Sequence, residues 1–243
     1  MGAMKRLVCI LALGLASMLY THAQPDGSNR RWSIDGGINS SIQTISSNDY
    51  PGNMKQAGLG WSFHAEYYLP DLPISVKAGY DREELALGGG DVSAQLNQFS
   101  LGGRWYMLPV HYIVQPFAGA DAYFHIGSRE EQGSVTSWGY RKGEWVKHYE
   151  TAYSVRIPRF SFAPVVGVDV YLLSCVALQL AYGYHVGVDS RFEVNTKNCQ
   201  TDRIYTTRTK GNRHTLSMGL KLTFPFSFSD SDTSSLIDWI LGL

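Results

Sequence analysis

Apolar and polar residues alternate with a period of two over most of the chain after residue 31. The pattern is clear where Leu59, Trp61, Phe63, Ala65, Tyr67 and Leu69 alternate with Gly60, Ser62, His64, Glu66 and Tyr68. A strand with one apolar and one polar face has this period. The alternation predicts eight β-strands, at about residues 32–42, 59–69, 74–81, 98–107, 117–126, 160–172, 176–189 and 215–226.

The connections between these strands alternate in length. Residues 46–56, 83–94, 128–157 and 190–212 are long and polar, whereas 70–73, 108–113 and 173–175 are short. Transmembrane β-barrels have short turns on the periplasmic side and long loops outside. A soluble barrel with an apolar lumen would show the same alternation, so that alternative stays open. The loop asymmetry, the aromatic strand ends and the polar second face favour an all-β, eight-stranded antiparallel transmembrane β-barrel with long extracellular loops and a short C-terminal tail.

The two ends of the chain differ in composition from the strands. Residues 1–23 have a basic start, Lys5 and Arg6, and an apolar run from Leu7 to Leu19, which is typical of a signal peptide and too short to span a bilayer. We therefore expect a lead at 24–30, a barrel at 31–226 and a tail at 227–243, with both termini in the periplasm. The tail ends in an apolar stripe that includes Trp239, which predicts either a short amphipathic helix or a frayed terminus.

Charge and cysteine content exclude several classes of function. Lys+Arg and Asp+Glu are both 21, so no basic excess indicates a nucleic-acid partner. We find no Cys/His cluster with the spacing of a metal site, and we expect no cofactor. Cys175 falls in a short turn and Cys199 in a long loop, at opposite ends of the predicted barrel. A disulfide needs Cα atoms within about 7 Å, so we expect two free thiols.

A short motif near the end of the last strand carries a family resemblance. The segment from Ser217 through Gly219 and Leu222 to Phe224 resembles the assembly signal of outer-membrane β-barrels. With its eight strands, the chain resembles the small outer-membrane barrel family of the OmpA/OmpX type. The Tyr-rich strands and Ala23-Gln24 resemble the versions found in Bacteroidetes. The resemblance implies a Gram-negative outer membrane, with the membrane lipid and the barrel-assembly machinery as partners. The chain departs from the family in continuing past the terminal aromatic residue.

The polar face of the predicted strands forms the candidate lumen. Its ionisable residues are Asp35, His64, Glu66, Lys77, Asp81, Arg104, Asp121, His125, Asp169, His185 and Lys221. An eight-stranded barrel fills its lumen with side chains, and paired charges satisfy one another there, so we interpret the set as a plug. A tight turn between residues 71 and 72 would place Glu66 opposite Lys77.

An enzymatic interpretation of the lumen has weaker support. His64 and Glu66 share a face, and a neighbouring His125 could complete an acid/base site. Lipid A deacylases have a His-x-Ser pair on one strand, which His125-Ile126-Gly127 lacks, and the palmitoyltransferase pattern is matched only by Asp189-Ser190. We therefore predict no catalytic residues and a protein that is not an enzyme.

Exposed aromatic and basic residues gather in the loop 128–157. They are Trp138, Tyr140, Arg141, Lys142, Trp145 and Tyr149. This composition is typical of a partner-binding surface, and it equally fits a hairpin that prolongs two strands beyond the bilayer, turning at Arg141-Lys142-Gly143. We expect an envelope-structural or loop-mediated interaction role, with a protein partner at 128–157 or at the tail. The alternatives are an accessory component of a secretion machine, similar to PorT-like type IX components, and a lipid A-modifying enzyme.

Overall fold

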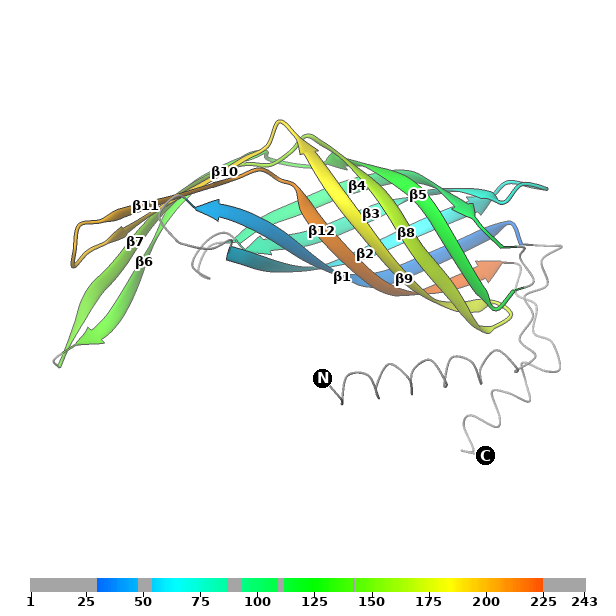
Figure 1. The fold of residues 1–243 in the computed structure, drawn as a ribbon, viewed down its shortest axis with the longest axis horizontal. Helices are drawn as coiled ribbons and strands as arrows, with labels where there is room; N and C mark the ends of the chain where they lie inside the picture. The colour runs from blue at the N-terminus through cyan, green and yellow to red at the C-terminus, as the bar shows by residue number, and fades with distance from the viewer. Residues whose placement is uncertain (1–29, 48–53, 87–92, 109–111, 142, 225–243) are drawn as a thin grey trace, which may run out of the picture.

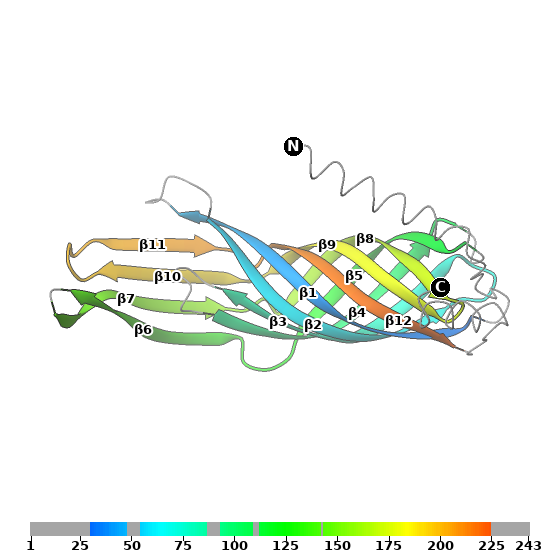
Figure 2. The same cartoon turned by 90° about the horizontal axis from the view of Figure 1, so that it is seen from below.

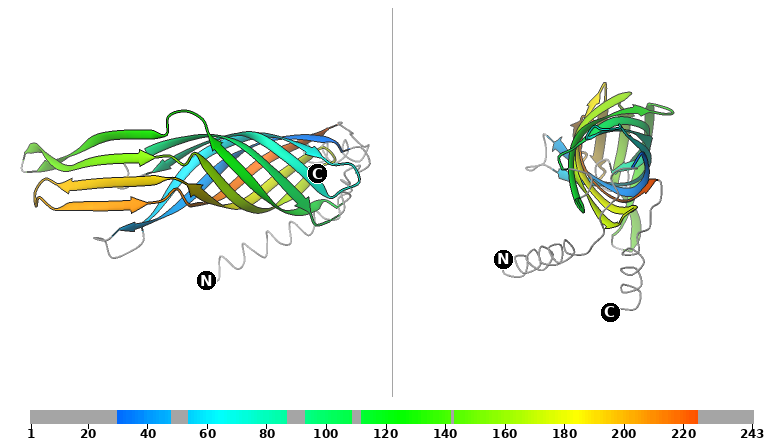
Figure 3. Two further views of the ribbon diagram at one scale, coloured as in Figure 1. Left: turned by 90° about the horizontal axis from the view of Figure 1, so that it is seen from above. Right: turned by 90° about the vertical axis from the view of Figure 1, so that its right-hand side faces the viewer.

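The computed structural model describes residues 30–47, 54–86, 93–108, 112–141 and 143–224, and it forms a closed barrel with an extension at one end (Figure 1). The barrel strands are β1 (Trp32–Ser47), β2 (Met54–Tyr68), β3 (Ile74–Ala86), β4 (Ser93–Tyr106), β5 (Val114–His125), β8 (Phe160–Leu173), β9 (Val176–Val188) and β12 (Arg213–Phe224). Each is antiparallel to its neighbours, and β1 pairs with both β2 and β12, which closes the ring seen end-on in Figure 3. The predicted eight-stranded antiparallel barrel is confirmed.

The exterior of the barrel is apolar over its whole circumference. Its exposed side chains include Trp32, Ile38, Trp61, Phe63, Phe99, Leu101, Trp105, Phe162, Val166, Met218 and Leu220. The residues between them in sequence point into the lumen, and most of these are buried and polar. An apolar band around a polar lumen is stable in the hydrocarbon core of a bilayer and unfavourable in water. The surface therefore defines a transmembrane barrel and not a soluble ligand-binding one.

The turn between β2 and β3 sets the register of that hairpin. Asp71 adopts a positive φ of 59°, and the Leu69 amide donates to the Ile74 carbonyl oxygen. The resulting pairs put Glu66 opposite Lys77, Ser62 opposite Asp81, and Tyr67 opposite Val76. This register agrees with the one predicted from the two flanking prolines. We call the end of the barrel with these short turns the turn end, and the other end the mouth.

The loops at 128–157 and 190–212 are not irregular. They form β6 (Glu130–Arg141), β7 (Glu144–Arg156), β10 (Arg191–Asn198) and β11 (Ile204–Thr209), which pair in the order β6-β7-β10-β11. This four-stranded sheet, which we call the paddle, projects beyond the mouth (Figure 2). Its edge strand β11 pairs with the end of β1, where Ser46 faces Arg208. The hairpin predicted for 128–157 is confirmed, whereas the pairing of the two loops with each other was not expected.

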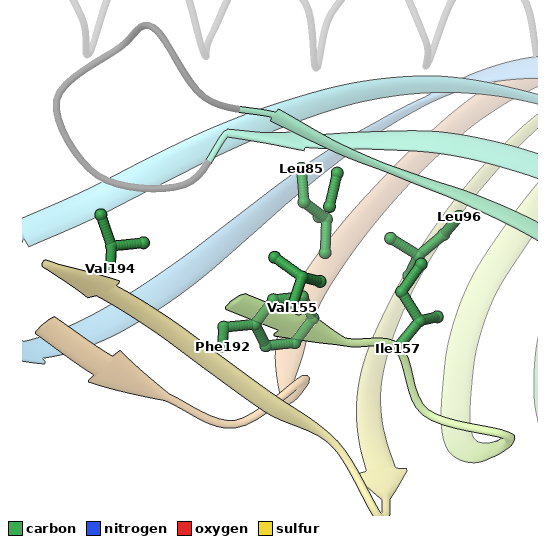
Figure 4. Packing of buried hydrophobic residues seen from close by; sticks show 7 residues of the cluster. Leu85, Leu96, Val155, Ile157, Phe192 and Val194 are labelled. Atoms are coloured by element: carbon green, nitrogen blue, oxygen red, sulfur yellow. The ribbon is translucent and has the colours of Figure 1, made fainter. Parts of the chain in front are cut away.

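A small apolar core joins the paddle to the barrel. It contains Leu85 and Leu96 from β3 and β4, Val155 and Ile157 at the end of β7, and Phe192 and Val194 from β10, which converge in Figure 4. Leu85 and Leu96 lie within the segment 83–94 and its border, which the sequence analysis treated as a polar loop. The two ends of this predicted loop were assigned wrongly, because β3 continues to Ala86 and β4 begins at Ser93. The core covers the mouth with buried side chains, and we call it the cap.

Several expectations lie outside the described residues. They concern the signal peptide at 1–23, most of the lead at 24–30, the tail at 227–243 and the turn residue Lys142.

Candidate functional site

A buried ion-pair network fills the lumen nearest the turn end. Lys221 on β12 is fully buried, and its Nζ lies 2.7 Å from Glu66 Oε2 and 2.5 Å from Asp169 Oδ2. The same ammonium donates to the Tyr106 hydroxyl at 3.0 Å. Glu66 also accepts from the Ser75 hydroxyl. One lysine thus neutralises carboxylates from two opposite sides of the barrel, β2 and β8.

Arg30 closes this end of the lumen. It precedes β1, and its guanidinium lies over the Tyr68 ring at 3.6 Å from the centroid. Arg30 Nη1 donates to Gln115 Oε1 at 2.7 Å, and Nη2 lies 4.0 Å from Asp169 Oδ2. The alternating pattern does not reveal this residue, because Arg30 precedes the first alternating segment. Its buried charge adds a second cation to the network around Glu66 and Asp169.

His64 lies at the centre of the lumen between two carboxylates. Its Nδ1 is 3.0 Å from Asp35 Oδ1 and its Nε2 is 3.2 Å from Asp81 Oδ2. Both ring nitrogens of His64 therefore lie within hydrogen-bond distance of a carboxylate oxygen. Lys77 donates to Asp35 Oδ1 at 3.0 Å, and Ser100 donates to Asp81 Oδ2 at 2.6 Å. A ring with both nitrogens engaged in this way has no free lone pair to act as a base.

A bidentate pair joins the inner faces of the neighbouring strands β4 and β5. Arg104 on β4 donates to both oxygens of Asp121 on β5, at 2.5 and 2.7 Å. Two parallel charge-assisted hydrogen bonds fix the geometry of such a pair. The adjacent inward positions are glycines: a Cβ on Gly102 would lie 1.8 Å from Asp121 Oδ1, and one on Gly79 would lie 2.4 Å from His64 Cδ2. Small residues on neighbouring strands thus provide the room that the large charged side chains occupy.

A third cluster lies nearer the mouth. Arg213 at the start of β12 donates to Glu83 at 2.7 Å and to Gln98 at 3.0 Å. The His185 ring stacks near Tyr123, with ring centroids 4.6 Å apart. A cavity of about 50 Å³ between these groups and the central pairs has space for a few water molecules. Glu83 was assigned to a predicted loop and Arg213 lies directly after one, so neither was predicted to face the lumen. Each nevertheless lies an even number of residues from a predicted lumen position.

One expectation about the lumen needs correction. His125 lies at the mouth, partly exposed, where its Nε2 is 3.0 Å from the Ser128 carbonyl oxygen, while His64 contacts Asp35 and Asp81. The structure therefore does not bring His64 and His125 together as an acid/base pair. Glu66 and Lys77 face each other in register, as predicted. Each forms its closest ion pair with another residue: Glu66 with Lys221, and Lys77 with Asp35. Because the barrel wall is curved, these two side chains reach charged groups on more distant strands.

One face of the β6–β7 hairpin collects exposed aromatic side chains. Tyr140 pairs with Trp145 across the hairpin, with ring centroids 5.5 Å apart, and Trp138 pairs with Lys147, whose Nζ lies 5.9 Å from its ring. Directly paired residues point to the same side of a sheet. The exposed fractions are 54% for Trp138, 66% for Tyr140 and 68% for Trp145. Tyr149 pairs with Ser137 beyond a register shift and therefore lies on the opposite face of the hairpin. Fold stability does not require three large aromatic side chains in water, so this face is the candidate binding surface.

The predicted assembly signal lies on the strand that closes the barrel. Ser217 pairs with Asn39, Gly219 with Gly37, Leu222 with Ile34 and Phe224 with Trp32. Close contact of the two strands requires glycine at one point, because a Cβ on Gly219 would lie 2.6 Å from the Gly36 carbonyl oxygen. The motif residues thus form part of the β1–β12 seam.

Sequence comparisons find no relative: no protein-family model matches the chain, and no curated protein matches it. Solved structures with a similar fold include Neisserial surface protein A (14% identity, 79% of this chain and 97% of that chain, TM-score 0.46). Ail of Yersinia pestis is also similar (11% identity, 81% of this chain and 99% of that chain, TM-score 0.44). So is OprG of Pseudomonas aeruginosa (11% identity, 82% of this chain and 98% of that chain, TM-score 0.42). The class of protein rests on the chain's own geometry: a closed, plugged, eight-stranded transmembrane β-barrel. No helix among the described residues is long and apolar enough to cross a bilayer.

Proposed function

We propose that this chain is a non-enzymatic integral outer-membrane protein that presents its paddle to a macromolecular partner outside the cell. The observation that carries the proposal is the exposed aromatic face of the β6–β7 hairpin on a sheet anchored to the barrel. Trp and Tyr are enriched at interfaces and dominate their binding energy. Because the cap holds the base of the paddle, less conformational entropy is lost on binding than for a free loop.

The lumen supports a structural role for the barrel itself. Its described charges are paired with one another, on neighbouring strands or across the lumen, and the cap and the Arg30 layer cover its two ends. The remaining cavity of about 50 Å³ is too small for a solute. This favours a rigid membrane anchor for the paddle over an open pore.

Co-purification from native membranes tests the proposal. We expect wild-type chain to retain a partner that is lost from a variant with Trp138→Ser, Tyr140→Ser and Trp145→Ser. The control is Ile204→Ser, an equally exposed apolar residue on β11 of the same paddle. Both variants should fold, as shown by heat-modifiable migration on gels. Identical partners for all three chains would contradict the proposal. A partner that is a secretion component would instead support the accessory-subunit alternative through the same surface.

A further inference from the structure

A basic hollow lies on the outer wall of the barrel, where the paddle leaves it. It measures about 640 Å³ and is lined by residues of β9, β10, β11, β12 and their connections. The groups that matter for binding are Arg191, Arg208, Lys210, His214, Tyr184 and Asn212. None of them belongs to the lumen network or to the aromatic face of the β6–β7 hairpin. Figure 1 shows β10 and β11 extending outward from the mouth, to the left of the ends of β9 and β12.

The strand register places the floor of the hollow at the upper edge of the apolar band. His214 on β12 lies between Tyr184 on β9 and Ile42 on β1, all on the exterior. The next exterior pair toward the turn end is Leu216 with Tyr182, and both side chains are exposed. The Tyr182 hydroxyl forms a hydrogen bond with His214 Nδ1 at 2.6 Å. An occupant of the hollow would thus have lipid-facing wall directly below it.

The charge of the hollow is incompletely balanced. Arg191 and Arg208 share one carboxylate, Glu193, at 2.7 and 3.1 Å. Lys210 makes no ion pair among the described residues, although its backbone carbonyl oxygen is held by Gln43. The nearby Asp189 is engaged by Arg129 and Arg156. Three permanent cations and one carboxylate therefore face a hollow that opens toward lipid.

We propose that this hollow binds the phosphorylated headgroup of a lipid in the leaflet at the mouth, with the acyl chains along β9 and β12. Arginine and lysine recognise phosphate through charge-assisted hydrogen bonds, and basic sites at the membrane surface bind anionic headgroups. The exposed Tyr182 and Leu216 provide the apolar contact that a free phosphate ion cannot use. The inference rests on the membrane insertion proposed above.

Native mass spectrometry of the full chain, refolded into phosphatidylcholine vesicles that contain bisphosphorylated lipid A, tests the site. We expect one lipid A to be retained per chain. The triple variant Arg191→Gln, Arg208→Gln and Lys210→Gln should lower the apparent affinity about 100-fold, or about fivefold per cation. Lys210→Gln alone, which breaks no ion pair, should lower it about fivefold. The control triple Arg141→Gln, Lys147→Gln and Arg159→Gln removes the same charge elsewhere and should leave the affinity unchanged.

The probe chemistry separates the possible ligands. Dephosphorylated lipid A should bind no better than phosphatidylcholine, and excess inorganic phosphate should not displace lipid A. Equal loss in both triple variants, equal binding of the dephosphorylated lipid, or displacement by inorganic phosphate would overturn the inference. Insertion into vesicles is followed separately by heat-modifiable migration. A chain that inserts without selecting lipid A refutes this site alone, whereas a chain that does not insert refutes the membrane function as well.

Discussion

Adjacent glycines on β4 have opposite surroundings. A Cβ on Gly102 would point into the lumen and lie 1.8 Å from Asp121 Oδ1, whereas one on Gly103 would meet only the Ser75 carbonyl oxygen, at 3.6 Å. Gly102→Ala should therefore destabilise the barrel by about 1–3 kcal/mol through overpacking against a fixed ion pair. Gly103→Ala should stay within about 0.5 kcal/mol of wild type. Urea unfolding in lipid vesicles measures both, and equal effects would show that the lumen face has been misassigned.

Lys221 has the largest expected effect of any single lumen residue. Lys221→Met should destabilise the barrel by about 3–5 kcal/mol, because Glu66 and Asp169 would stay buried without their shared cation. The double variant Lys221→Met with Glu66→Gln should recover part of that loss, since one unpaired charge is removed. The control is Arg141→Met, because Arg141 is an exposed residue at the tip of the paddle. Denaturant unfolding would contradict the prediction if the double variant were less stable than Lys221→Met alone.

At the scale of elements, the cap decides whether the paddle is held in place. Phe192 is 1% exposed and packs with Leu85, Leu96 and Val155. Phe192→Ala should cost about 3–5 kcal/mol locally, so that protease cuts β6, β7, β10 and β11 faster than in the wild-type chain while the barrel remains heat-modifiable. Trp145→Ala, at an exposed position, should leave the protease pattern unchanged. Loss of barrel folding in Phe192→Ala would show that the cap belongs to one cooperative unit with the barrel.

The base of the paddle has a pH-dependent contact. The hydrogen bond from Arg129, with the charge of Arg156, holds the pKa of the exposed Asp189 carboxyl below its ordinary value. A carboxyl with a lowered pKa stabilises the folded state above its ordinary pKa of about 3.9, and that contribution is lost as the pH falls through the folded-state value. Amide exchange in β10, corrected for intrinsic rates, should therefore accelerate as the pH falls below the ordinary carboxyl pKa of about 3.9. Asp189→Asn should remove this pH dependence; equal profiles for both chains would refute it.

At the scale of the whole molecule, the cysteines report orientation. Neither forms a disulfide; Cys175 is buried in the turn between β8 and β9, and Cys199 is partly exposed beyond β10, at the far end of the paddle. If the mouth faces outward, a membrane-impermeant maleimide should label Cys199 in intact cells, and Cys199→Ser should abolish labelling. Protease added to intact cells should cut the paddle and spare residues 173–175. Labelling only after outer-membrane disruption would reverse the proposed orientation.

The sequence by itself determined the barrel. Period-two alternation assigned the eight barrel strands and their two faces, because side-chain direction in a strand depends only on parity. Two prolines around Asp71 and Leu72 set the register of β2 with β3, because a short turn leaves few ways to pair the strands. The inward direction of residues such as Asp35, Lys77 and Lys221 also followed from parity.

The tertiary structure alone decided which of these residues meet. Lys221 reaches Glu66 and Asp169 across the lumen, because closure of the sheet brings distant strands face to face. The paddle was likewise hidden: β7 and β10 are joined only through β8 and β9, and their pairing depends on where the barrel places both loops. The cap and the basic hollow are consequences of that pairing. Local pattern specifies each strand, but contacts between segments far apart in sequence arise only when the ring closes.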